Sequence, residues 1–578
     1  MSTHKKIDII CIVSVFLAIG LTILLMVGAA LGILPVISQE TDSGMFTAND
    51  LNADWDVSSA TKITLSDKGS VISGNGAYVH DGNIYIAYAG HYVLSGELTN
   101  GSVIIDGDKS DKIWLLLDGV TIHCDDGAAI RVEQADKVFL TLADNTENAI
   151  SSGARYDAEM TDSGVDGAIY SKDDLTINGT GGLAVSTEYE HGIVCNDDLV
   201  ITGGNIAINA IQDGIHANDS VCIRDSALFI SAGDDGITVS NDDETAFLYV
   251  ESGRISITDC YEGLEAVDIT IAGGTIDIMA SDDGINASGS GENSLIRIID
   301  GDIRIINPSG RDADGLDSNG DIYIEGGRVF ISVADSGGNC AIDYGSENGG
   351  RCVVSGGTVI ACGSSMMAEG FDADSSQGFL MYSAAVGEGT TISLEDSEGN
   401  ELLSEEIPYG FSSVVLSTPE LKVGDICTVT IDDVEAQITI DNSMISGFGP
   451  GEMFGGGMPD GGDHGGMPEG QGNRDNQPFV DRGDVERPER PQDVERPERP
   501  QDVLTVDNMF EPSDGMEPPD RQEMQRDETP PRQLDREQIN PGENVLSSNN
   551  SSVDTLILLG SSVLILVIGL FVVMKIKH

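Results

Sequence analysis

Short apolar runs separated by glycine and acidic residues recur through the middle of the chain. Between residues 165 and 365, a step of one acidic residue, one glycine and one apolar residue returns every 21 to 31 residues. Runs of three to five β-forming residues, divided by Gly or Asp, are typical of a coil made of three short strands. The step occurs at Asp166-Gly167, Asp213-Gly214, Asp235-Gly236, Glu262-Gly263, Asp283-Gly284 and Asp314-Gly315, with degenerate copies at His191-Gly192 and Cys340-Ala341.

This period predicts an all-β fold, a right-handed parallel β-helix. Helical repeats of similar length carry Ala/Leu/Glu-rich stretches that are absent here, and propeller blades need periods near 40 residues. We expect about eight recognisable coils over residues 165–378, preceded by an irregular, β-rich start of the helix over 45–164. Because stacking buries one face of every strand, the apolar residues of the step should form one internal ladder. They are Ile193, Ile215, Ile237, Leu264, Ile285 and Leu316.

The flanking segments have other compositions. Residues 379–442 predict a small β module, and residues 443–552 are rich in Gly, Met, Pro, Glu and Arg, which predicts a disordered stalk. Residues 9–37 are predicted to be a signal anchor or a long signal peptide, and residues 553–575 a transmembrane helix. Since lysines flank both outer ends, the positive-inside rule places the bulk of the chain outside the cell membrane.

Composition narrows the classes of partner. The chain has 97 Asp and Glu against 30 Lys and Arg, a net charge of −67. Charge of this sign and size opposes binding to nucleic acid and excludes it as a partner. Of the nine cysteines, Cys11 lies in the N-terminal apolar segment, and the other eight form no CxxC pair. An extracellular location permits disulfides, but we expect these eight to be buried and unpaired in the stacked coils.

The acidic residues of the step suggest a metal site. Equivalent positions of a parallel stack lie about 4.8 Å apart, and two like charges at that distance repel by about 3 kcal/mol at an effective dielectric constant of 20. Oxygen ligands in this setting favour Ca²⁺. The alternative is that each Asp-Gly pair forms a tight turn in which Gly takes a positive φ. The candidate calcium ligands are Asp213, Asp234, Asp235, Glu262, Asp282, Asp283, Asp314 and Asp317.

Catalytic residues are harder to find. A polysaccharide lyase needs a base beside its calcium, and no lysine occurs between Lys172 and Lys422. Arg311 is the one candidate base, because it is close in sequence to Asp314. A hydrolase could use Asp213 with Asp234 or Asp235, but no group that would hold a uronic acid accompanies them. The sequence therefore predicts a protein that is not an enzyme.

Two longer motifs carry a family resemblance. Residues 136–148 (DKVFLTLADNTEN) and 168–179 (AIYSKDDLTING), together with the repeated steps, resemble bacterial cell-surface carbohydrate-binding proteins. The resemblance runs from Phe46 to Ile440. It implies a polysaccharide-lyase-like β-helix, bound Ca²⁺, and affinity for cellulose or acidic, uronic-acid polysaccharide without cleavage. The family often has Lys just after the step, where this chain has His216, Thr238 and Asn286.

The expected function is therefore calcium-assisted, non-catalytic binding of polysaccharide by an extracellular, membrane-tethered protein. A calcium-dependent, pectate-type lyase is one alternative. A structural or adhesive surface protein, in which the β-helix is only a rigid rod, is the other.

Overall fold

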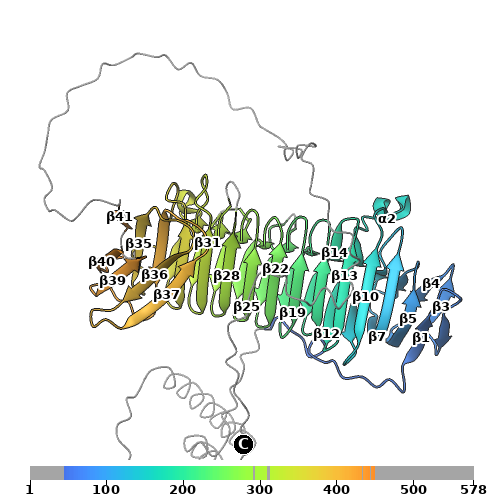
Figure 1. Cartoon of the computed structure of the whole chain (residues 1–578). Helices are drawn as coiled ribbons and strands as arrows, with labels where there is room; N and C mark the ends of the chain where they lie inside the picture. Colours follow the sequence, from blue (N-terminus) through green and yellow to red (C-terminus); the bar gives the residue numbers. More distant parts are fainter. Residues whose placement is uncertain are drawn as a thin grey trace, which may run out of the picture. The chain divides into compact units, whose positions relative to one another are not determined.

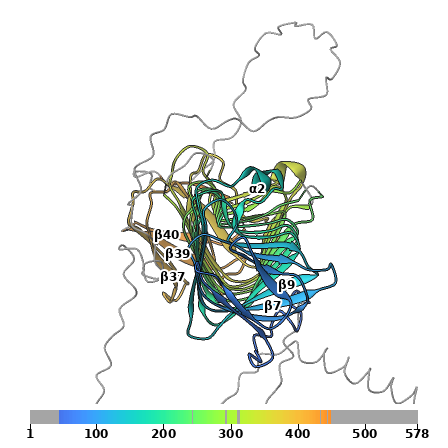
Figure 2. The same cartoon turned by 90° about the vertical axis from the view of Figure 1, so that its right-hand side faces the viewer.

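A parallel β-helix forms the body of the protein (Figure 1). The computed structural model describes residues 44–241, 243–290, 293–308, 313–432, 434–442 and 444–448. Seen along the stack in Figure 2, successive coils superimpose. The predicted terminal membrane segments, nearly all of the predicted stalk, and Arg311 lie outside the described residues. None of the helices in the described part has the length and apolar composition needed to cross a membrane.

One side of each coil is a short strand of the 12-stranded sheet, here called sheet B. From β4 onward its neighbouring strands pair in parallel, while β3 pairs with β4 antiparallel. The strands are β3 (Ala77–His80), β4 (Asn83–Ile86), β6 (Val103–Asp106), β8 (Ile130–Gln134), β11 (Gly167–Ser171), β14 (His191–Cys195), β17 (Ile215–Ala217), β20 (Ile237–Val239), β23 (Leu264–Ala266), β26 (Ile285–Ala287), β29 (Leu316–Ser318) and β32 (Ile342–Tyr344).

The other two sides belong to the 25-stranded sheet, here called sheet A. One side is formed by β9 (Lys137–Leu142), β12 (Asp174–Gly179), β15 (Asp198–Ile201), β18 (Ser220–Ile223), β21 (Phe247–Val250), β24 (Asp268–Ile271), β27 (Leu295–Ile298), β30 (Asp321–Ile324) and β33 (Cys352–Val354). The other is formed by β10 (Glu147–Ser152), β13 (Gly182–Thr187), β16 (Asn205–Asn209), β19 (Ala227–Ser231), β22 (Arg254–Asp259), β25 (Thr275–Met279), β28 (Asp302–Asn307), β31 (Arg328–Val333) and β34 (Thr358–Gly363).

The stack begins well before residue 165. The long strands β5 (Gly90–Leu98) and β7 (Lys112–Cys124) each bend across both sides of sheet A and pair in parallel. Strand β1 (Thr61–Leu65) pairs with β5 and with β2 (Val71–Ser73), which lies at the N-terminal edge. The N-terminal part is thus continuous with the coils. Short helices α2 (Ala158–Asp162) and η2 (Ser346–Asn348) lie in connecting loops.

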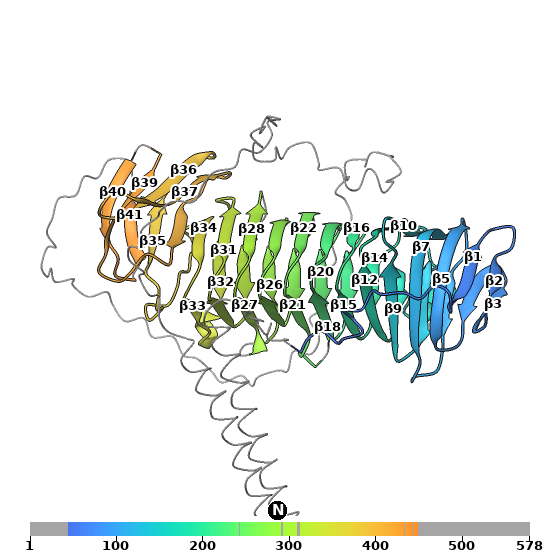
Figure 3. The same ribbon diagram turned by 90° about the horizontal axis from the view of Figure 1, so that it is seen from below.

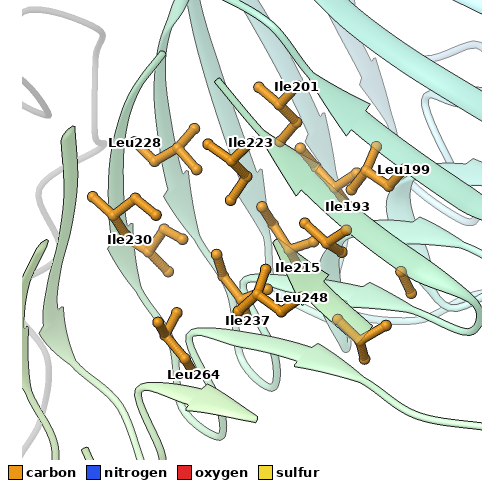
Figure 4. Close-up of a cluster of buried hydrophobic side chains, with 14 of the residues drawn as sticks. Ile193, Leu199, Ile201, Ile215, Ile223, Leu228, Ile230, Ile237, Leu248 and Leu264 are labelled. Carbon is orange, nitrogen blue, oxygen red and sulfur yellow. The ribbon is translucent and has the colours of Figure 1, made fainter. Parts of the chain in front are cut away.

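The predicted internal ladder is confirmed. Ile193 pairs with Ile215, Ile215 with Ile237, and the register continues through Leu264, Ile285 and Leu316. All six of these side chains are fully buried, and Figure 4 shows four of them on successive coils with residues of sheet A around them. Burial of a Leu or Ile side chain contributes about 1.5–3 kcal/mol, so the ladder is a main source of stability.

The two ends of the stack differ (Figure 3). At the C-terminal end, β35 (Phe379–Ala384) and β38 (Ser413–Ser417) extend sheet A, while β36 (Thr390–Glu395), β37 (Glu401–Ile407), β39 (Ile426–Ile431) and β40 (Val434–Thr439) form a separate antiparallel sheet. The predicted boundary of the stalk at residue 443 is wrong. Residues Met444–Phe448 form strand β41, which pairs in parallel with β35 and so continues sheet A.

A segment near residue 50 crosses the outside of sheet A (Figure 3). Phe46 packs on Val200 and Cys222. Asp50 is 1% exposed, and its carboxylate lies 3.1 Å from the ammonium of Lys137. These contacts cover the outer face of β9 to β21.

The glycines of the repeated step serve close packing rather than turns. The expected positive φ is wrong for Gly214, Gly236 and Gly284, none of which lies in the left-handed region. A Cβ on Gly284 would lie 2.4 Å from Cγ2 of Ile305 and 2.7 Å from the carbonyl oxygen of Gly315. The backbones of successive coils therefore approach too closely for any side chain at this position.

We expect Gly284→Ala to destabilise the protein by about 2 kcal/mol or more, because overpacking against backbone cannot be relieved by a rotamer change. Thermal unfolding followed by circular dichroism would measure the loss. Gly387→Ala is the matched control, because a Cβ there meets nothing within 4 Å and its φ is not in the left-handed region. Equal melting temperatures for the two variants would contradict this explanation.

Candidate metal and glycan site on sheet B

The outer surface of sheet B carries parallel lines of polar side chains, and together they are called the acidic face here. Strands β17, β23, β26 and β29 each bury their first and third residues and turn the middle residue outward. Two residues before each strand stands a member of the repeated step. These form the column His191, Asp213, Asp235, Glu262, Asp283 and Asp314, and the middle residues form the outer line His216, Thr238, Glu265, Asn286, Asp317 and Asp343.

In most column carboxylates, one oxygen accepts a hydrogen bond from a backbone N–H of the next coil. Oδ1 of Asp213 accepts from the backbone N–H of Asp235 at 3.2 Å, and Oδ1 of Asp235 accepts from that of Glu262 at 3.1 Å. Asp283 accepts from the N–H of Asp314 at 2.7 Å, and Asp314 accepts from that of Cys340. This part of the column therefore has a structural role, since it satisfies buried amides between coils.

Several column carboxylates also contact the outer line. Oδ2 of Asp235 accepts from the Thr238 hydroxyl at 3.0 Å, and Oε2 of Glu262 accepts from the Asn286 amide at 3.0 Å. Asp283 shares a side-chain hydrogen bond with Asp317. Two carboxylates can share such a bond only when one of them holds a proton. A metal cation could take the place of that proton.

Carboxylates crowd around Glu262 in particular. One oxygen from each of Asp235, Glu262 and Glu265 lies within 4.8 Å of the others, and the same holds for Glu262, Asp282 and Asp283. Glu262 thus belongs to both groups. The column and the outer line contain no Lys or Arg in their described positions, so His191 and His216 are their only basic side chains there.

Burial makes these carboxyl groups hard to ionise. It raises the pKa of Glu262 to about 8, with repulsion from Glu265 and Asp235 adding to the effect. Burial raises the pKa of Asp314 to about 7, and it raises the pKa of Asp235 and of Asp283 as well. In each case loss of hydration is the largest cause and neighbouring carboxylates add to it, while backbone hydrogen bonds partly oppose the shift at Asp235, Asp283 and Asp314. A bound dication would reverse the two raising effects.

Asp213 has a different environment. Its Oδ2 lies 2.8 Å from Nδ1 of His216 and 3.1 Å from Nδ1 of His191. Although burial opposes ionisation, hydrogen bonds from His191 and His216 hold the pKa of Asp213 well below its ordinary value. The column therefore has two chemical regions, one of oxygen ligands alone and one that includes imidazole nitrogen.

The structure places most of the predicted ligands together. Asp235, Glu262, Asp282 and Asp283 fall in the two groups around Glu262. Asp234 shares the register position of Asp282. Asp314 and Asp317 follow on the next coil. Asp213 lies instead between the two histidines.

The predicted place of Asp166 in the column is wrong by one residue. Gly167 pairs with His191, so Asp166 aligns with Glu190 and not with the column. One extra residue, Ala168, stands there between Gly167 and Ile169, whereas Gly192 is followed directly by Ile193.

Sequence analysis missed Glu265 and Asp343 as members of the acidic face. The signal was present, because each stands three residues after a column position, as Asp317 does after Asp314. A further acidic group, Asp174 with Asp197 and Asp198, lies near the corner that leads into sheet A. Burial raises the pKa of Asp197 to about 6.

Comparisons with known proteins agree with the predicted resemblance. Residues 80–359 match the family model described as carbohydrate-binding domain-containing protein. A carbohydrate-binding domain-containing protein of Acetivibrio thermocellus is 36% identical over 146 residues, which is 25% of this chain and 51% of the relative. The chain thus spans about half the length of the curated relative it matches. The solved structure of a polysaccharide lyase-like protein from C. thermocellum, a gadolinium derivative, is 29% identical, with a TM-score of 0.36 over 45% of this chain and 94% of that one.

Proposed function

Because residues 80–359 match the family of carbohydrate-binding domain-containing proteins, we propose that the protein binds polysaccharide through the acidic face of sheet B. Calcium held by the carboxylates around Glu262 would assist this binding. The observation that carries the proposal is that two groups of three carboxylates have Glu262 in common. The column to which Glu262 belongs contains no Lys or Arg.

The chemistry favours calcium over other cations. Ca²⁺ takes six to eight oxygen ligands in flexible geometry and accepts carboxylates from several chain segments. Around Glu262, Asp235 and Asp283 the candidate donors are oxygens, and they come from three successive coils. Burial and neighbouring carboxylates raise the pKa of these groups, and a dication would provide a compensating positive charge.

The ligand class follows from the charge of the face. A uronic-acid polysaccharide is an anion and would be repelled by ionised carboxylates. A calcium ion that keeps open coordination positions can be bound by protein carboxylates on one side and by uronate and hydroxyl oxygens on the other. Acidic polysaccharide is therefore the better candidate for this face, and an uncharged polymer such as cellulose would depend less on calcium.

The wider setting is also part of the proposal. The apolar segments 9–37 and 553–575 would tether the chain to the cell membrane and leave the β-helix outside the cell. Binding without cleavage is proposed because the column and the outer line of the acidic face offer no Lys or Arg as a base in their described positions.

The test is a pull-down of the purified full-length protein on insoluble polygalacturonate and cellulose, with calcium or with EDTA. We expect calcium-dependent retention on polygalacturonate that EDTA abolishes. Glu262→Gln should weaken it at least about tenfold, because it removes the charge shared by both groups. Glu97→Gln, an exposed position on β5, should have no effect.

Two results would count against the proposal. Absence of retention on either polymer with and without calcium would contradict glycan binding. Release of an unsaturated uronide, followed by its ultraviolet absorbance, would show that the protein is a lyase instead.

A further inference from the structure

Two imidazoles occupy one end of the acidic face. His191 on β14 and the outer-line residue His216 come from adjacent coils, and their ring centroids lie 5.0 Å apart. Asp213 lies between them, with Oδ2 at 3.1 Å from Nδ1 of His191 and at 2.8 Å from Nδ1 of His216. Three atoms that can each bear a lone pair thus converge on one point. In the metal-free protein, a ring N–H of His216 can donate to Oδ2 of Asp213.

We propose that His191, Asp213 and His216 bind a divalent transition-metal ion such as Zn²⁺ or Cu²⁺. Zinc–ligand bonds of about 2.0–2.1 Å in tetrahedral geometry place neighbouring ligand atoms about 3.3 Å apart. The observed separations of 3.1 and 2.8 Å are a few tenths of an ångström shorter. Small side-chain movements would therefore admit the ion, without any change in the coils.

The three groups are held in place before any ion binds. Oδ1 of Asp213 accepts from the backbone N–H of Asp235 at 3.2 Å, which leaves Oδ2 directed at the two rings. The N–H of Asp213 lies 3.2 Å from Nδ1 of His191, so this ring is also positioned by the backbone. The Asp213 and His191 side chains are only 7% and 11% exposed. Positioning of this kind raises metal affinity, because little conformational entropy is lost on binding.

Two further carboxylates lie near His191. Asp166 and Glu190 have carboxylate oxygens within 4.8 Å of a ring nitrogen of His191 and of each other. Oδ1 of Asp166 is buried, and among the described residues it has no hydrogen-bond partner. Such an orphaned oxygen is costly, and an adjacent cation would satisfy it. Three carboxylates around two neutral imidazoles also favour a dication electrostatically.

The donor set separates this site from the groups around Glu262. Imidazole nitrogen favours Zn²⁺ and Cu²⁺, whereas Ca²⁺ selects oxygen ligands alone. His216 and Glu262 belong to coils two steps apart, about 10 Å along the stack. The two sites can therefore be emptied and tested independently, and this inference does not rest on glycan binding.

The experiment uses the full-length protein, purified without a polyhistidine tag and stripped with EDTA. Calorimetric titration with Zn²⁺ alone should show about one tight site, and the electron paramagnetic resonance spectrum of bound Cu²⁺ should show nitrogen coupling. His216→Ala should weaken Zn²⁺ binding at least about 100-fold, because it removes a direct ligand. His216 is partly exposed, so the variant is expected to fold.

The control is Glu262→Gln, which should leave Zn²⁺ binding unchanged while it weakens Ca²⁺ binding. Equal Zn²⁺ affinity in the parent and His216→Ala proteins would overturn the proposal, as would a Cu²⁺ spectrum without nitrogen coupling. Weakening of Zn²⁺ binding by Glu262→Gln to the same extent as by His216→Ala would also overturn it, because the ion would then occupy the oxygen groups.

Discussion

Calcium is expected to raise the thermal midpoint of unfolding strongly near pH 8 and only weakly near pH 5. The reason is the ionisation state of the acidic face. Burial raises the pKa of Glu262 from 4.5 to about 8 and that of Asp314 from 3.8 to about 7. At about pH 5 these groups hold protons in the folded protein, and calcium must compete with them. At about pH 8 most of that competition is gone.

The sign of the metal-free pH dependence follows from the same pKa values. Between about pH 4.5 and pH 8, Glu262 and Asp314 keep their protons in the folded state and lose them in the unfolded state. Stability falls with rising pH wherever the folded state binds more protons. Without metal, the protein should therefore become less stable as the pH rises through this window. Each ionised carboxylate then adds repulsion along the stack.

Differential scanning calorimetry at both pH values, with calcium or with EDTA, measures this effect. Sodium chloride at matched ionic strength is the control, because screening alone would also reduce repulsion. An equal calcium response at both pH values would contradict the account. So would a metal-free protein whose stability rises between pH 5 and pH 8.

The coil architecture is predictable from sequence because its causes are local and repeated. Burial of one apolar residue per coil forces Ile215, Ile237 and Leu264 into one register, and the glycine before each is required by the approach of the next backbone. Both signals recur many times, so a few degenerate copies such as His191-Gly192 do not obscure them. The same regularity places Asp235 and Glu262 in one column.

Other features depend on contacts that the repeat does not encode. The one-residue shift at Asp166 arises from the extra residue Ala168, and strand β41 forms because β35 offers it an open edge. The pairing of Asp213 with two histidines needs side chains from different register positions on adjacent coils. A repeat alignment shows His191 only as a degenerate copy of the step, although in the structure its ring contacts the Asp213 carboxylate.

The structural and the metal-binding roles of the column can be separated by a double variant, Asp283→Asn with Asp317→Asn. Asparagine keeps an oxygen that can accept from the N–H of Asp314, so the link between coils at 2.7 Å should survive. The two substitutions replace two carboxyl groups that lie close enough to share a hydrogen bond while one of them is protonated, and that repel each other once both are ionised. The metal-free variant should therefore be at least as stable as the parent near pH 8, because its local repulsion is smaller.

Calcium binding should change in the opposite direction. Loss of two carboxylates from a calcium site should weaken affinity at least about 100-fold, because ligand charge sets much of the affinity for Ca²⁺. Calorimetric titration measures this, and the exposed Asp118→Asn serves as the control. If the column served only to link coils, the variant would lose stability or keep its calcium response. Gain of metal-free stability together with loss of calcium binding is expected only if the same carboxylates repel each other without metal and bind the cation when it is present.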